Sequence, residues 1–338
     1  MTAARGFVTA GTWCADHNKV VPHWPDEDVV VEILSEEIRA GGSAANFAID
    51  MRRLDPTMPV ATIGLVGQDE DGAILLAEAE AAGIDTSRLI RKPGVRTNAT
   101  DAFTSLHSGR RTHLFHPAVA RELSPDHFTF KDNEARYLHL GLPGIHEKLD
   151  NPWQEDANGW VTVLRKARAA GMRTNLELCS IPAERINTIV RPCLPHLDLL
   201  LVNDFEIMAI DGMKGQPGSE PDSDELIAAA KRVLAAGAME LVVVHFPMAA
   251  VAVARDGTVW RQPSVAIPEV EIQGPNGAGD AFTAGFLYAL HEDWPIDDAL
   301  RLAHASAATA LRGFGTTDTV ETWKSCLDRA AFWGQRRE

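Results

Sequence analysis

The sequence contains little cysteine, and the few cysteines form no metal or disulfide pattern. Four are spread over 338 residues without the short spacings typical of zinc sites: Cys14, Cys179, Cys193 and Cys326. Secreted proteins that depend on disulfides use cysteine at a much higher density. The sequence therefore predicts free thiols in a reducing compartment.

Long apolar runs and an excess of positive charge are also missing. No run is long enough to span a membrane, and residues 1–8 have neither the charge nor the apolar core of a signal peptide. The formal net charge is -15, so the surface offers no basic field to a nucleic acid or an anionic membrane. We expect a cytoplasmic protein that binds neither of these partners and holds any anionic substrate by local donors.

Two nucleotide-binding motifs are absent as well. The chain contains no Gly-x-x-x-x-Gly-Lys-Ser/Thr, which argues against P-loop chemistry. No Gly-x-Gly-x-x-Gly follows the first predicted strand, residues 7–12, which argues against a Rossmann dehydrogenase.

What is present is an ordinary globular composition, with 45% hydrophobic and 23% charged residues. From residue 136 onward, strand-like and helix-like segments alternate, which predicts right-handed crossovers and a parallel sheet. We therefore predict an α/β fold in a single domain that covers residues 1–338.

The most informative stretch is residues 271–290, where a glycine-rich turn leads into an apolar helix. Gly277, Ala278 and Gly279 lack bulk and lie at the positive end of the helix dipole, so the turn predicts an anion site. Asp280 follows directly, although its carboxylate repels the anion that the turn attracts. A general base for a hydroxyl that attacks a phosphoryl group would need this position, whereas the structural alternative is a plain helix cap.

A second polar group is predicted at an earlier helix start. Gly41 and Gly42 allow close approach of the backbone, and Asn46 offers a donor and an acceptor that suit a vicinal diol. Asp16 follows the first strand, at the end where α/β sheets bind ligands. A turn aspartate that bonds its own backbone would explain Asp16 equally simply.

Asn203 and Glu206 lie three residues apart where strand 197–202 gives way to a helix. An amide and a carboxylate suit a hydrated Mg²⁺ and nucleotide phosphates, but the same pair fits a capping box. His304 lies on a helix predicted over residues 296–311, and from the residues alone a satisfied core histidine is the better interpretation.

Two further segments predict a small β-sheet. Residues 20–31 have the character of interrupted strands, and residues 97–115 alternate apolar and polar residues around a turn, as in a hairpin. Together they predict a lid of about four strands, formed by residues 14–40 and 96–118.

The chain resembles the ribokinase-like, or PfkB, family of carbohydrate kinases over almost its whole length. The resemblance rests on Gly-Gly-x-x-x-Asn at residue 41, Asn-x-x-Glu at residue 203 and Gly-Ala-Gly-Asp at residue 277, with Asp16 and Gly67-x-Asp69-x-x-Gly72 in support. It implies a three-layer α/β sandwich with a mostly parallel central sheet and a small β-sheet lid. It also implies phosphorylation of a sugar-like hydroxyl by ATP, with Mg²⁺.

By position, the resemblance assigns a role to each candidate residue. Asp280 matches the catalytic base. The anion hole matches Gly277, Ala278 and Gly279. The sugar-binding positions match Asp16, Gly41, Gly42 and Asn46. The nucleotide-binding positions match Asn203, Glu206, which would reach Mg²⁺ through water, and His304, which falls where many members place an adenine-contacting Asn.

Two departures from the family pattern affect the part of the site that would bind the phosphate donor, ATP. Gly274-Pro275 replaces an Asp-Thr that helps many members hold a monovalent cation, so activation by K⁺ is left open. Residues 245–250 replace a Thr-x-Gly-x-x-Gly turn that contacts the nucleotide, so ATP is an expectation from the resemblance. A sugar-binding sensor without catalysis and a nucleoside kinase of the same fold are the alternatives.

The lid also bears on specificity and assembly. Arg96, Arg110, Arg111 and His113 could suit an acidic sugar, or could simply make the lid soluble. Unpaired strand edges on a lid favour pairing with a second copy, so we expect a homodimer through the lid. The sequence does not identify the sugar.

Overall fold

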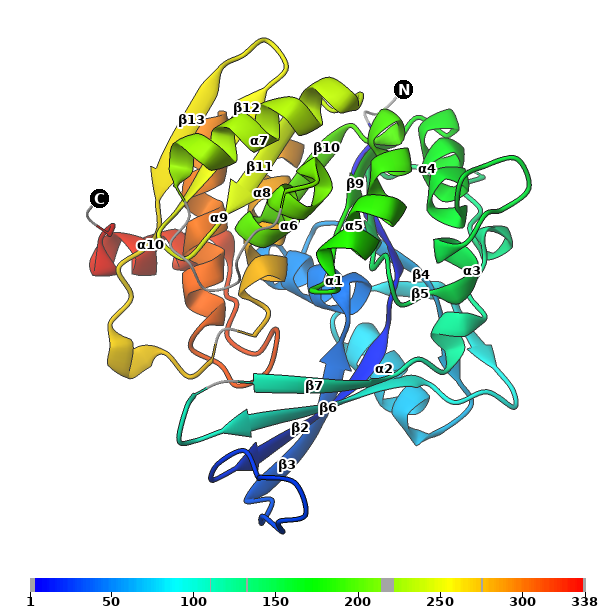
Figure 1. The fold of residues 1–338 in the computed structure, drawn as a ribbon, viewed down its shortest axis with the longest axis vertical. Coiled ribbons are helices and arrows are strands. Elements are labelled where there is room, and N and C mark those ends of the chain that lie inside the picture. The colour runs from blue at the N-terminus through cyan, green and yellow to red at the C-terminus, as the bar shows by residue number, and fades with distance from the viewer. Residues whose placement is uncertain (1–3, 110, 132, 214–221, 275, 337–338) are drawn as a thin grey trace.

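Three layers make up the protein, with a mostly parallel β-sheet between two layers of helices (Figure 1). The computed structural model describes residues 4–109, 111–131, 133–213, 222–274 and 276–336. The predicted fold class, an α/β sandwich with a small additional β-sheet, is confirmed.

The central sheet consists of two hydrogen-bonded halves. The first half has the order β5-β4-β1-β8-β9 and the second the order β10-β11-β12-β13. The strands of the first half are β1 (Phe7–Gly11), β4 (Val60–Gly67), β5 (Asp85–Lys92), β8 (Tyr137–Gly141) and β9 (Arg173–Leu176). Those of the second half are β10 (Leu199–Asn203), β11 (Leu241–His245), β12 (Ala249–Ala254) and β13 (Val259–Pro263). All pairs in the first half are parallel, whereas β12 and β13 pair antiparallel, which the sequence patterns did not predict.

Polar side chains join the two halves between β9 and β10. The backbone N–H of Leu201 donates to Asn175 Oδ1 at 3.3 Å, and that of Asp198 donates to the carbonyl of Thr174 at 3.1 Å. Thr174 Oγ1 in turn donates to the Asp198 carboxylate at 2.9 Å. The side chain of Asn175 thus takes the place of a backbone partner where the regular ladder stops.

Each face of the sheet is covered by helices that bury one apolar side. One core includes residues of α4 (Gly159–Ala169), α5 (Ala183–Val190), α6 (Asp204–Asp211) and α7 (Ser223–Ala236). The other includes residues of α1 (Ser43–Leu54), α2 (Glu70–Ala81), α8 (Ala278–His291), α9 (Ile296–Ala310) and α10 (Trp323–Trp333). The remaining α3 (Glu147–Asp150) is a single turn. The prediction of an apolar helix after the glycine-rich turn is confirmed, because Phe282 and Phe286 of α8 are fully buried.

The small sheet has the order β3-β2-β6-β7, from β2 (Cys14–Val21), β3 (Ser35–Gly41), β6 (Asn98–Ser105) and β7 (Arg111–His116). The predicted hairpin is confirmed, since β6 and β7 pair antiparallel. The prediction of strands over residues 20–31 is wrong. No strand lies between Val21 and Ser35, where Pro22 and Pro25 have no N–H to donate to a ladder.

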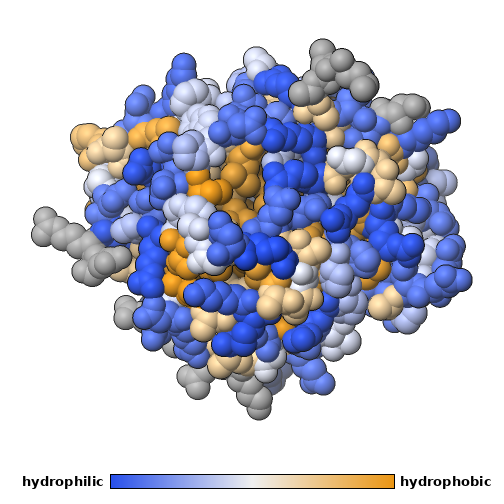
Figure 2. All heavy atoms as spheres, turned by 90° about the horizontal axis from the view of Figure 1, so that it is seen from above, coloured by the Kyte–Doolittle hydropathy of each residue, from blue (hydrophilic) through white to orange (hydrophobic). Residues whose placement is uncertain are grey.

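The parallel strands point their carboxyl ends toward the small sheet, which lies across that end of the molecule (Figure 1). Figure 2 shows the opposite face, where hydrophilic residues cover most of the surface and apolar ones lie mainly in the recesses. Within the described ranges, every helix falls short of the length and hydropathy that a membrane span requires.

Candidate active site

Helix α8 begins at the turn that was predicted to bind an anion. Gly277 is the N-cap residue and has a φ of 74°, in the left-handed region that favours glycine. A Cβ at this position would lie 1.9 Å from the carbonyl oxygen of Thr316, so no other residue fits. Ala278 and Gly279 follow as the first helical residues, and no side chain of the N-cap residue occupies their N–H groups. The turn therefore presents backbone donors at the positive end of α8.

Asp280 faces Asn46 from the first turn of α8. Asn46 Nδ2 donates to Asp280 Oδ2 at 2.9 Å, a contact between residues 234 positions apart. Asn46 Oδ1 accepts from Thr316 Oγ1 at 2.8 Å, which sets the orientation of the amide. Asp280 is therefore not a plain helix cap, because its side chain contacts Asn46 of α1. Thr316 was missed by sequence reasoning, since nothing in its local sequence marks it.

Burial shifts the pKa values of Asp280 and of a second carboxyl group, Glu177. Burial raises the pKa of Asp280 to about 6, and the hydrogen bond from Asn46 opposes that rise. Glu177, just beyond β9, is also buried, and burial together with the charges of Asp280 and Glu206 raises its pKa well above the usual range. Its Oε2 atom has no hydrogen-bond partner among the described residues. Glu177 was not predicted, and no apolar run marks its position, because three of the four residues of β9 are polar or charged.

Asp16 and Gly41 belong to the same polar site as Asn46 and Asp280. Asp16 lies inside β2, so the alternative of a turn aspartate is wrong. A Cβ at Gly41 would lie 2.2 Å from Asp16 Oδ2, and glycine is therefore required at the end of β3. Burial raises the pKa of Asp16 to about 6, which Arg111 opposes and the charge of Asp280 reinforces. We call Asp16, Gly41, Asn46 and Asp280 the aspartate cluster.

Gly42 places Asn46 within the cluster. It is the N-cap residue of α1 with a φ of 85°, and its carbonyl accepts the backbone N–H of Asn46 at 2.9 Å. Asn46 is therefore held one turn inside α1, with its side chain directed at α8.

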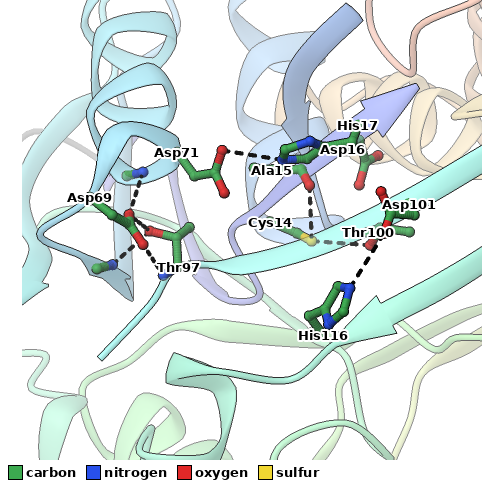
Figure 3. A network of polar contacts seen from close by, with 12 residues as sticks. Cys14, Ala15, Asp16, His17, Asp69, Asp71, Thr97, Thr100, Asp101 and His116 are labelled. Carbon is green, nitrogen blue, oxygen red and sulfur yellow. Dashed lines mark hydrogen bonds and ion pairs between the residues drawn. The ribbon is translucent and has the colours of Figure 1, made fainter. Parts of the chain in front are cut away.

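A network of polar contacts fixes β2 against its neighbours (Figure 3). His17 contacts Asp71 of α2 at 3.2 Å, and Cys14 Sγ contacts Thr100 Oγ1 of β6 at 3.2 Å. Asp69 caps α2 by accepting the N–H of Gly72 at 3.0 Å. These contacts hold the strand that carries Asp16 in place.

A cavity of about 320 Å³ lies on the other side of the first turn of α8. Its lining includes Asn203, His245, Ala278, Gly279, Phe282 and His304. We call it the histidine cavity. None of the four members of the aspartate cluster lines it, so the start of α8 separates the two. A larger hollow of about 1110 Å³ is lined by residues such as Arg5, Pro59 and Arg88, near the amino ends of β1 and β4, and includes no predicted site residue.

His304 is both a core histidine and a cavity residue. Its Nε2 lies 3.1 Å from the carbonyl oxygen of Gln262, and its ring packs edge-on against Phe282 at 5.1 Å. Burial lowers the pKa of His304 to about 3 and that of His245 to about 4, so both rings are neutral near pH 7.

Asn203 and Glu206 form the capping box that was the structural alternative. Glu206 N donates to Asn203 Oδ1 at 2.8 Å, and Asn203 N donates to Glu206 Oε2 at 3.0 Å. Burial raises the pKa of Glu206 to about 7. Only Asn203 of the pair lines the cavity, so a role of Glu206 toward magnesium stays a prediction. Gly274 is described, whereas Pro275 of the predicted departure lies outside the described residues.

Comparison with known proteins shows which families and folds this chain resembles. The family model described as "pfkB family carbohydrate kinase" matches residues 7–323. Adenosine kinase of Schizosaccharomyces pombe is 24% identical over 288 residues, 82% of this chain and 81% of that protein. The 2-dehydro-3-deoxygluconokinase of Dickeya dadantii is 26% identical over 291 residues, 83% of this chain and 90% of that protein.

Solved structures share the fold. Ribokinase of Arabidopsis thaliana, complexed with ribose and ATP, has a TM-score of 0.78 to this structure at 20% identity. The match covers 97% of this chain and 99% of that one.

Proposed function

The chain belongs to the pfkB family of carbohydrate kinases, and from this premise we propose that it transfers the γ-phosphate of ATP to a hydroxyl of a sugar or related small molecule. Relatives that act as sugar and nucleoside kinases support the assignment of a phosphotransferase. The observation that carries the proposal is the contact between Asn46 and Asp280 beside the donor-rich start of α8.

Asp280 acts as the general base in this proposal. With a pKa near 6 it is mostly ionised at pH 7, and it takes the proton of the acceptor hydroxyl as that oxygen bonds to the γ-phosphorus. The bond between the γ-phosphorus and the bridging oxygen breaks, and ADP leaves. Backbone N–H groups at Gly277, Ala278 and Gly279 stabilise the transferring phosphoryl group. Asn46 holds the Asp280 carboxylate in place. Together with Asp16 it also binds hydroxyls of the acceptor, next to Gly41 and Gly42.

The histidine cavity takes the nucleotide base. Its location directly behind Ala278 and Gly279 would direct the phosphates of a bound nucleotide toward the anion hole, and Asn203 and His304 line it. Neutral, buried imidazoles and the ring of Phe282 suit a flat, uncharged heterocycle. Phe246 and Pro247 contribute to the same wall, in the segment that departs from the family's glycine-rich turn.

Magnesium fits the charge distribution at this point. Burial, together with the charge of Asp280, raises the pKa of both Glu177 and Glu206. Glu177 Oε2 has no hydrogen bond among the described residues and lies 4.0 Å from His139 Nε2, so it can accept a cation. In the described ranges no three side chains gather closely enough to hold a metal by themselves. Glu206 would reach Mg²⁺ through water, and the ion would neutralise phosphate charge.

The small sheet serves as the lid, within a single domain that spans the chain. Exposed apolar side chains in and beside this sheet support a homodimer through the lid: Trp24, Val29, Val30, Ile33, Leu34, Leu106 and Leu114. Light scattering on the purified protein tests this assembly, and a monomer at micromolar concentration would contradict it.

The decisive experiment is a coupled assay of ADP release over a panel of sugars, sugar acids and nucleosides, with and without K⁺. We expect acceptor-dependent ADP release that requires Mg²⁺. Calorimetric titration with ATP separates the alternatives, since a sugar-binding sensor need not bind nucleotide. A preference for adenosine or inosine would instead favour the nucleoside kinase.

A further inference from the structure

Arg111 reaches from the small sheet to the segment after α9, and it lies near enough to Asp16 for their charges to interact. It is the first residue of β7, and its Nη1 donates to the carbonyl oxygen of Phe314 at 3.1 Å. Phe314 belongs to the segment after α9, two residues before Thr316, which binds Asn46. Arg111 therefore joins the lid to the segment that supports the catalytic turn.

The other edge of this guanidinium is free. Arg111 Nε and Nη2 are both buried from solvent and have no hydrogen-bond partner among the described residues. In arginine these two nitrogens point their N–H groups in the same direction, and this side-on edge forms the paired hydrogen bonds to a carboxylate. Leaving charged donors buried without a partner is costly, so their arrangement indicates a ligand that supplies the acceptors.

Asp16 does not satisfy that edge. The structure records no ion pair between Arg111 and Asp16 within the described residues, although their charges influence each other. Because Asp16 makes no hydrogen bond to Arg111 Nε or Nη2, the N–H groups of that edge remain available to a bound molecule. The guanidinium and the aspartate are then two separate recognition groups.

We propose that the acceptor carries a carboxylate, bound by the Nε and Nη2 edge of Arg111, while Asp16 and Asn46 bind its hydroxyls. This inference rests on the proposed kinase activity and deepens it by naming sugar acids as the substrate class. A carboxylate matches one planar guanidinium in shape and charge. A phosphate dianion would be only half neutralised by this one guanidinium and would lie near the carboxyl group of Asp16.

The test compares acceptors in wild type and in Arg111→Met. The probes are D-gluconate and 2-dehydro-3-deoxy-D-gluconate as acids, D-glucose and D-ribose as neutral sugars, and D-glucose 6-phosphate. We expect an acid to have the highest kcat/KM. Arg111→Met should lower that value about 100-fold or more, and should lower any activity on neutral sugars far less, through the lost bond to Phe314 alone. Arg111→Lys should recover only part of the loss, because an ammonium group lacks the paired edge. Arg96→Met is the matched control and should behave as wild type, because this exposed lid arginine makes no side-chain hydrogen bond or ion pair within the part of the chain that the structure describes.

Binding measurements separate this inference from the kinase proposal. Calorimetric titration of the acids into wild type and Arg111→Met needs no turnover, and the loss of binding should again be about 100-fold. Equal binding by the two proteins, or a neutral or phosphorylated sugar as the best acceptor, would overturn the inference. If no acceptor releases ADP and ATP does not bind, the kinase proposal fails, while the titration still decides the role of Arg111.

Discussion

The aspartate cluster and the histidine cavity lie on opposite sides of the first turn of α8, and burial has opposite effects on them. Burial disfavours the charged form of any group, so it raises the pKa of Asp16 and Asp280 to about 6 and lowers those of His245 and His304 to about 4 and 3. The aspartates can therefore change charge near physiological pH. The histidines remain neutral throughout that range.

This difference separates chemistry from recognition. A general base works best when its pKa lies near the working pH, and the two carboxyl groups of the aspartate cluster meet this condition. The histidine cavity offers apolar walls and fixed neutral rings, which suit binding by contact. Variants on one side of α8 should consequently change turnover, and variants on the other should change nucleotide affinity.

The largest effect is expected from Asp280→Asn. Turnover should fall by roughly two to four orders of magnitude, because the amide cannot take the hydroxyl proton. Binding of the acceptor and of ATP should change little, as measured by calorimetry. The melting temperature should rise by about 2 °C, since the variant removes a buried acidic group with a raised pKa. Near-normal turnover would remove Asp280 from its role as base.

A smaller loss is expected from Asn46→Ala, which leaves Asp280 in place without its donor. We expect kcat/KM for the acceptor to fall about 10- to 100-fold, while the Kd of ATP stays unchanged. Thr316→Val is the matched control, because it removes only the group that orients Asn46 and should show a milder loss of the same kind. An effect of Asn46→Ala on ATP binding as large as that on the acceptor would contradict the separation of the two sides.

Local chemistry explains how much of the site could be predicted. A glycine turn, a helix start and an acid lie within four residues at Gly277 to Asp280, so their function depends on geometry that the helix itself supplies. The contact from Asn46 to Asp280, the support by Thr316 and the free edge of Arg111 depend instead on tertiary packing. No local pattern marks such contacts, and only the resemblance to a family placed Asn46 near Asp280.

The small sheet shows the same limit at the level of secondary structure. Val29 and Val30 favour a strand by propensity, yet both are exposed and lie in none, the latter at 96% exposure. The polar residues at Asp16 to Lys19 have weak strand propensity but pair on both sides, with β3 and with β6. Ladder bonds from two neighbours outweigh the propensity of the segment.

The pH dependence sharpens the comparison between the two sides. Because the base is the ionised carboxylate, kcat/KM should fall as pH drops through about 6, by about tenfold at pH 5. In Asn46→Ala the midpoint should move upward, since the hydrogen bond that lowers the pKa of Asp280 is gone. Neither histidine should add a pH dependence to the Kd of ATP between pH 8 and pH 6, because both are neutral there. A midpoint shared by ATP binding and turnover would show that the two sides titrate together.

The smallest effect is expected on the cavity side, from His304→Ala. The Kd of ATP should rise about 3- to 10-fold, because the variant removes a ring that lines the cavity and packs against Phe282. Turnover at saturating ATP should stay within about twofold of wild type. His291→Ala is the matched control, since His291 is equally buried on α8 but contacts Gly6 at the far end of the sheet. Both variants lose core packing, so an equal change in ATP affinity would assign the effect to stability. A change confined to His304→Ala would instead show that the cavity binds the nucleotide through contact, without any titrating group.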